Sequence, residues 1–164
     1  MSDKIFVIGN KKEEVVLRKK IPSLDLAREN KKEIKDLIKR MRVIMKKANG
    51  IGLSANQIGF QKRLFVAQVP DEHGHQKFYA VINPEIVKVS KEKISSEEGC
   101  LSVPIDLFGL VERPEQVVLQ GYNLEGKKIK IKAWGLLARV FQHEVDHLNG
   151  TIFVDKTKHL NKKI

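Results

Sequence analysis

Apolar side chains recur with the period of an α-helix between positions 135 and 148. They stand at i, i+1, i+4 and i+5 and again near the end of the segment: Leu136, Leu137, Val140, Phe141 and Leu148. This spacing gathers apolar residues on one side of a helix. Asn149 and Gly150 follow, and both residue types suit the left-handed conformation that ends many helices. We therefore predict a helix from Gly135 to Leu148.

A second helix is predicted near the N-terminal third of the chain. Asn30 and Glu33 have the residue types preferred at the N-cap and at the third helical position. An apolar stripe at helical spacing follows them: Ile34, Leu37, Ile38, Met41, Ile44 and Met45. The basic and Asn-Gly residues in 46–50 match the charge and cap preferences of a helix end. This helix is expected to pack against a core.

Short apolar runs bounded by turn residues are typical of β-strands. Such runs lie at 64–69, 78–82, 86–89, 117–119 and 129–132, and a further short strand is predicted at 4–8. Turns are predicted at 71–76 and 123–126. With the two helices, this order indicates an α+β domain in which antiparallel sheets wrap around the central helix of residues 135–148. We expect one catalytic domain over 1–164, with a short basic tail at about 155–164.

The central helix carries His143, Glu144 and His147, which form the pattern H-E-x-x-H. Residues i and i+4 share a helix face, so both imidazoles can reach one metal ion. Glu144 lies about 100° around the helix and can approach a water on that ion, as in metallohydrolases. The face that holds both histidines continues the apolar residues Leu136 and Val140 and is expected to point toward the core. The alternative is a surface helix that carries these three residues by chance.

A catalytic site of this kind needs a third protein ligand. A downstream glutamate at thermolysin-like spacing would fall near the end of the chain, and Phe153 occupies the position of the third metzincin histidine. The remaining histidines lie in a polar turn or a lysine-rich tail and are expected to be surface residues: His73, His75 and His159. Cys100 is the remaining candidate. Its residue type fits a buried hydrophobe, a metal ligand or a nucleophile.

The charge pattern changes this picture little. Lysine and arginine number 31 against 20 acidic residues, for a net charge of +11. That charge favours an anionic neighbour such as RNA, but the lysines are scattered, which is more typical of a solvated surface than of a specific DNA contact. One cysteine and the lack of a long apolar run lead us to expect a reducing cytoplasm and no membrane contact. We also expect a monomer. An organellar or phage origin stays open.

Three stretches resemble, in order, the motifs of peptide deformylases: Gly50-Ile51-Gly52-Leu53-Ser54-Ala55-Asn56-Gln57, Glu98-Gly99-Cys100-Leu101-Ser102 and Gln142-His143-Glu144-Val145-Asp146-His147. The resemblance covers about residues 30–155. It implies hydrolysis of the formyl group from N-formylmethionyl nascent peptides, with release of formate. It also implies one divalent metal ion, typically Fe(II), with Zn, Ni or Co as alternatives.

The resemblance assigns roles to individual positions. Cys100, His143 and His147 would hold the metal, and Glu144 would be the general acid and base. Gln57 and the backbone N–H of Leu101 would stabilise the oxyanion. The remaining positions would contact the substrate or support the site: Ile51, Gly52 and Gly99 for the substrate, and Arg113 paired with Asp146 as support. An apolar pocket for methionine is expected from Val140 and the stretch 105–110.

Several positions depart from the family pattern. Ser54 stands where alanine is usual, and no arginine occurs in 105–109, where some members have one facing the substrate. The usual Pro-Asp before Leu17-Arg18 is absent. The tail is short and basic, whereas some members contact the ribosome through a longer C-terminal helix, so ribosome contact stays open. Two other functions stay open as well, namely a zinc peptidase or amidase of other specificity and a basic RNA-binding module with a structural metal.

Overall fold

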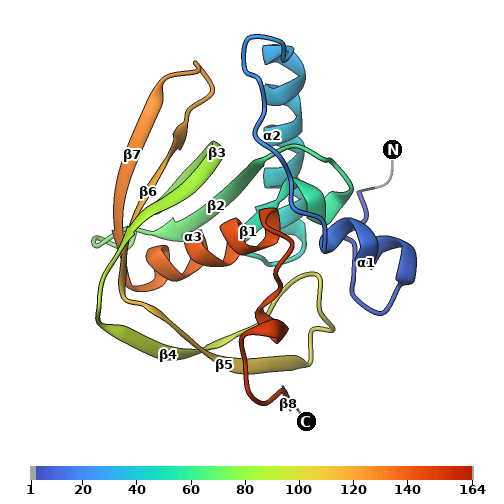
Figure 1. The fold of residues 1–164 in the computed structure, drawn as a ribbon, viewed down its shortest axis with the longest axis vertical. Coiled ribbons are helices and arrows are strands. Elements are labelled where there is room, and N and C mark those ends of the chain that lie inside the picture. The colour runs from blue at the N-terminus through green and yellow to red at the C-terminus, as the bar shows by residue number, and fades with distance from the viewer. Residues whose placement is uncertain (1–2, 164) are drawn as a thin grey trace.

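The computed structural model describes residues 3–163 (Figure 1). Within these residues the chain forms three α-helices, α1 (Lys11–Leu17), α2 (Lys31–Lys47) and α3 (Gly135–Leu148), and two short 3-10 helices at Ala55–Ile58 and Phe153–Asp155. The strands are β1 (Gly52–Ser54), β2 (Leu64–Pro70), β3 (Gln76–Val89), β4 (Lys93–Glu98), β5 (Leu107–Pro114), β6 (Gln116–Tyr122), β7 (Lys128–Trp134) and β8 (Asn161–Lys162). None of the helices described is long and apolar enough to cross a membrane.

The strands form two antiparallel sheets. One has five strands in the order β1-β2-β3-β6-β7, and the other has three in the order β4-β5-β8. Figure 1 shows α3 lying across the middle of the molecule, with the larger sheet on one side and β4 and β5 on the other. The predicted α+β class with antiparallel sheets around this helix is confirmed.

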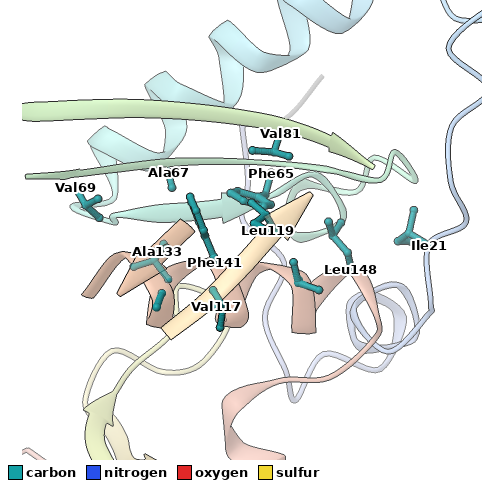
Figure 2. Packing of buried hydrophobic residues seen from close by; sticks show 13 residues of the cluster. Ile21, Phe65, Ala67, Val69, Val81, Val117, Leu119, Ala133, Phe141 and Leu148 are labelled. Carbon is teal, nitrogen blue, oxygen red and sulfur yellow. The ribbon is translucent and has the colours of Figure 1, made fainter. Parts of the chain in front are cut away.

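One face of α3 packs on the larger sheet (Figure 2). Its buried residues on this face are Ala138, Phe141, Val145 and Leu148. The ring of Phe141 lies 5.6 Å from that of Phe65 on β2 and 5.3 Å from that of Tyr79 on β3, centroid to centroid. We expected the α3 face that carries Leu136 to point into the core. This expectation was wrong near the start of the helix, because Leu136 is 51% exposed. That face lines a cleft instead.

The opposite face of β2 packs on α2. Side chains of β2 alternate between the two layers, so Phe65 and Ala67 contact the α3 side while Leu64 and Val66 contact the α2 side. All six residues of the predicted α2 stripe are buried. The side chain of Asn30 caps the helix as predicted. At its other end Asn49, with φ of 56°, adopts the left-handed conformation. The larger sheet is thus covered by a helix on each face, which fixes β1 beside α3.

Other local predictions were wrong or incomplete. Residues 4–8 form no strand; they are an irregular segment in which the N–H groups of Phe6 and Ile8 donate to the carbonyls of Gln57 and Ser102 at 2.7 and 2.9 Å. The apolar residues at 15–17 belong to helix α1, which Asn10 caps. The two strands predicted at 78–82 and 86–89 are one strand, β3, with irregular pairing around Asn83. Strands β4 and β5 were not predicted.

Candidate active site

A cleft of about 420 Å³ opens between β1, α3 and the segment that links β4 to β5. Its residues come from three parts of the chain: Ala48–Gly52 with Gln57, then Glu97–Leu101 with Ile105, and finally Leu136, Arg139, Val140, His143 and Glu144 from α3. These are the three stretches that the sequence motifs singled out. Of the predicted methionine pocket, Val140 and Ile105 line the cleft, whereas residues 106–110 do not.

Three atoms that could bind a metal ion converge beside this cleft. The Sγ atom of Cys100 lies 3.1 Å from Nε2 of His147, which lies 3.2 Å from Nε2 of His143. One ligand atom from each residue falls within 4.8 Å of the other two. His147 is fully buried, while His73, His75 and His159 are exposed and do not belong to this group. Among the candidate third ligands, the structure therefore brings Cys100 to the histidine pair.

This group of atoms fits a divalent transition metal. A thiol and two imidazoles are the ligand types that such ions prefer. The two Nε2 atoms lie 3.2 Å apart beside the Cys100 sulfur, and a shared cation would satisfy both nitrogens and the sulfur together. The opposite ring nitrogen of His143, Nδ1, lies 3.0 Å from the carboxylate of Glu98, which orients the ring with Nε2 toward the other two ligands.

Glu98 connects the histidine to two arginines. Its carboxylate accepts hydrogen bonds from Arg113 and, at 2.8 Å, from Arg139. Burial alone would raise the pKa of Glu98, but its bonds to His143 and Arg113 outweigh burial and hold that pKa well below its usual range. Sequence reasoning assigned Glu98 no role. A carboxylate two residues before a candidate ligand was the available signal.

Arg113 also forms the ion pair with Asp146 that we expected. Its Nη1 lies 2.8 Å from Oδ2 of Asp146, so this one guanidinium joins β4, β5 and α3. Glu98 and Asp146 together outweigh burial and raise the pKa of Arg113, which stays charged. The arginine holds the strand that precedes Cys100 against the helix that carries both histidines.

Glu144 lies beside the ligand cluster and is 3% exposed. Burial raises its pKa to about 7, against the opposing effects of the charge on His143 and a hydrogen bond from Ser54. The Ser54 hydroxyl lies 2.7 Å from Oε2 of this carboxylate. Oε1 lies against Gly52, where a Cβ atom would come within 2.3 Å of it. The side chain therefore has little room to move.

The amide of Gln57 is fixed with its NH₂ group toward Cys100. Its Oε1 accepts a hydrogen bond of 2.8 Å from the Ser54 N–H, and its Nε2 lies 3.1 Å from the Ser102 hydroxyl and 3.7 Å from the Cys100 sulfur. Ser102 is fully buried and was not predicted to contribute. Leu101 lines the cleft and packs over Gly50. The amide donor, the thiol and the histidines thus face one space.

Ile51, Gly52 and Gly99 line the same cleft. Strand β1 stands at one end of the larger sheet, so its second edge is free of strand partners among the described residues. Ile51, just before β1, is 44% exposed, and the cleft mouth also exposes Ile105 and Leu136. An extended peptide with an apolar first side chain would fit such an edge and such walls.

The fold and cleft together define a class of protein. A buried carboxylate next to a ligand cluster, with an amide donor aimed at the same space, is the arrangement of a metal-dependent hydrolase that acts on a carbonyl group. The helix, the sheet edge and the Cys100 segment all contribute to this arrangement, so the class rests on the tertiary structure as well as on the H-E-x-x-H pattern.

The chain belongs to the polypeptide deformylase family, whose model matches residues 2–163. A peptide deformylase from Thermodesulfovibrio yellowstonii is 42% identical over 149 residues, which cover 91% of this chain and 87% of that protein. Among solved structures, a probable peptide deformylase from Synechococcus phage S-SSM7 superposes with a TM-score of 0.83 at 40% identity, covering 94% of this chain and 99% of that one. The peptide deformylase from Thermotoga maritima gives 0.82 at 36% identity, covering 95% and 97%.

Members of this family are metal-dependent hydrolases that remove the formyl group from the N-terminal formyl-methionine of nascent peptides. The family and the hydrolytic activity predicted from the three motifs are confirmed.

Proposed function

We propose that this chain deformylates nascent peptides with a metal ion held by Cys100, His143 and His147, and with Glu144 as its general acid and base. The observation that carries the proposal is the convergence of the three ligand atoms beside the buried carboxylate. When bound, a divalent ion would polarise the formyl carbonyl and acidify water. Fe(II) is the ion we propose, on the basis of the resemblance, and Zn, Ni and Co have compatible ligand preferences.

Glu144 moves the proton in the proposed reaction. Its carboxylate accepts a proton from the attacking water and later donates that proton to the amine that leaves as formate is released. A group that both accepts and donates a proton works best when its pKa is near the working pH. The pKa of Glu144, raised to about 7 by burial, supports this role.

Gln57 and the backbone N–H of Leu101 are proposed to stabilise the negative charge that develops on the formyl oxygen. Donors of this kind contribute most when they are fixed before the reaction. The Gln57 amide meets this condition because the Ser54 N–H holds its Oε1 in place, so the NH₂ group stays directed toward the ligand cluster.

The substrate is proposed to bind as an added strand along β1. Main-chain groups of Ile51, Gly52 and Gly99 would pair with the peptide backbone, which all nascent chains share. The methionine side chain would lie between Val140, which is buried, and Leu136, which is half-exposed at the cleft mouth. The lack of an arginine at 105–109 leaves little at the rim to select the following side chains.

We further propose a cytoplasmic monomer that meets its substrates at the ribosome. The support for ribosome contact is the net charge of +11, since lysine-rich surfaces associate with RNA through a salt-dependent attraction. Co-sedimentation with ribosomes should therefore weaken as salt rises. Binding that is absent even at low salt would contradict this part of the proposal.

The decisive experiment measures formate release from a formyl-Met peptide by protein purified without oxygen, with metal content determined on the same sample. We expect turnover that scales with bound metal. Metal-loaded protein that cleaves other amides but releases no formate would indicate a peptidase or amidase of other specificity. Salt-sensitive RNA binding without any hydrolysis would indicate a binding module.

A further inference from the structure

Ser54 is buried at the point where β1 meets α3. Residues i and i+2 of a strand point to the same side, and accordingly Gly52 and Ser54 both face Glu144, while Leu53 packs in the core beside α2. The Ser54 side chain is fully buried. Among the residues that the structure describes, its hydroxyl has two hydrogen-bond acceptors, both in Glu144, namely carboxylate Oε2 at 2.7 Å and the backbone carbonyl at 3.0 Å.

A hydroxyl placed between these two acceptors can keep a hydrogen bond to Glu144 throughout a proton transfer. A serine hydroxyl donates one hydrogen bond and accepts others. Toward an ionised carboxylate, the Ser54 hydroxyl donates to Oε2. Toward a protonated carboxyl group, it can accept the acid proton while its own hydrogen turns to the Glu144 carbonyl. The carboxyl group is then held in one position in both forms.

The backbone of Ser54 holds a second group. Its N–H donates to Oε1 of Gln57 at 2.8 Å, which directs the Gln57 NH₂ group to the ligand cluster. One residue of β1 therefore contacts both the proposed acid–base group and the proposed oxyanion donor. The side-chain contact is the one that distinguishes this chain from family members with alanine at this position, because alanine keeps the N–H but has no hydroxyl.

We infer that Ser54 is a positioning residue whose hydroxyl holds the Glu144 carboxylate in its working orientation. The inference rests on the proposed function of Glu144. Because family members with alanine are expected to position this carboxylate without a hydroxyl, the effect of its loss should be moderate. It should act on the chemical step and leave peptide binding along β1 unchanged.

The test compares Ser54→Ala with the wild-type protein, with turnover expressed per bound metal ion. We expect kcat to fall about three- to tenfold with KM unchanged, as for the loss of one hydrogen bond to a charged group. The matched control is Ser90→Ala, which removes a hydroxyl bonded to the Glu92 carbonyl and the Gln116 N–H, in the β3–β4 connection. The control should leave both constants unchanged. A Ser54→Ala variant with kcat within twofold of wild type, or with only KM raised, would overturn the inference.

A second measurement does not depend on turnover. Thermal unfolding of metal-loaded wild type, Ser54→Ala, Glu144→Ala and the double variant forms a double-mutant cycle. If the hydroxyl and the carboxylate interact, the double variant should lose less in Tm than the two single variants lose together. Strictly additive losses would refute the contact. A coupled cycle in a wild-type protein that releases no formate would instead show that the proposed function, and not the Ser54 contact, is at fault.

Discussion

The close approach of Gly52 to Glu144 allows the proposed chemistry to be tested with one methyl group. In Gly52→Ala the new Cβ would lie 2.3 Å from Oε1 of Glu144 and 2.9 Å from its carboxyl carbon, whereas ordinary contacts begin at 3.4 Å. The backbone at Gly52 has no left-handed conformation that alanine would resist. The substitution is therefore a local steric change, and the carboxylate must retreat by about 1 Å, a displacement of the size that can cost about 100-fold in rate.

We expect Gly52→Ala to lower kcat for formate release by about 100-fold, with metal content unchanged. Stability should fall less than for a clash with backbone, because the clashing atoms belong to the Glu144 side chain and alanine restricts the unfolded chain more than glycine does. The assay is steady-state formate release together with metal analysis and a thermal melt. A kcat within twofold of wild type would refute the assignment of Glu144 as proton carrier in this position. A rise in KM alone would instead assign Gly52 to substrate pairing only.

The matched control is Gly121→Ala on β6. There a Cβ would lie 2.6 Å from a Val81 side-chain atom and 2.9 Å from the Ile82 carbonyl, far from the cleft. This variant meets backbone as well as side chain, so it should lower Tm more than Gly52→Ala does. Its folded fraction should keep the wild-type kcat. The pair separates a displaced carboxylate from a general loss of stability.

Three further substitutions test other parts of the structure. Glu144→Ala should lower kcat by at least about 100-fold, as for loss of a general acid–base group, and metal analysis should show the ion retained; loss of the ion would assign Glu144 to binding. Glu98→Gln should weaken metal affinity, measured by chelator competition, by about 10- to 100-fold. The control is Glu97→Gln at the exposed neighbouring position, which should keep the wild-type affinity. Equal metal affinities of Glu98→Gln and the wild-type protein would contradict the orienting role of Glu98. Arg63→Met should lower the free energy of unfolding by about 3 kcal/mol, because the guanidinium donates to the carbonyls of Ile21, Leu148 and Pro84. Urea titration measures this free energy. A loss below about 1 kcal/mol would show that water replaces these hydrogen bonds in the variant.

The helices could be predicted because their apolar spacing is long and regular. Helix α3 has the predicted bounds, and α2 buries every residue of the predicted stripe. Strand β5 escaped prediction because it inverts the usual pattern of apolar residues facing inward and polar residues facing outward. Its inward positions include Gly109 and Arg113, while Leu110 points outward and is 60% exposed. Strand β4 has a mostly exposed polar sequence with no apolar period at all. Helix α1 is only seven residues long, too short for a period to show.

The proposed ligand pair could be recognised because both histidines lie on one helix, at a fixed spacing. The distance of 43 residues between Cys100 and His143 depends on how the second sheet folds back, so residue spacing alone left the role of Cys100 open. Glu98, Ser102 and Ser54 contact other motif residues, and such contacts appear only when the three motifs meet in space.

The segment before α2 is joined to parts of the chain that are synthesised much later. Ile21 donates its N–H to the carbonyl of Leu148, and Arg18 pairs with Asp155, 137 residues further on. Ile8 donates in the same way to Ser102. Contacts between such distant positions form slowly and only after both partners have left the ribosome. During translation the first residues therefore stay without these partners until the chain has emerged as far as Asp155, and the proposed metal site, whose last ligand is His147, is completed late in that process.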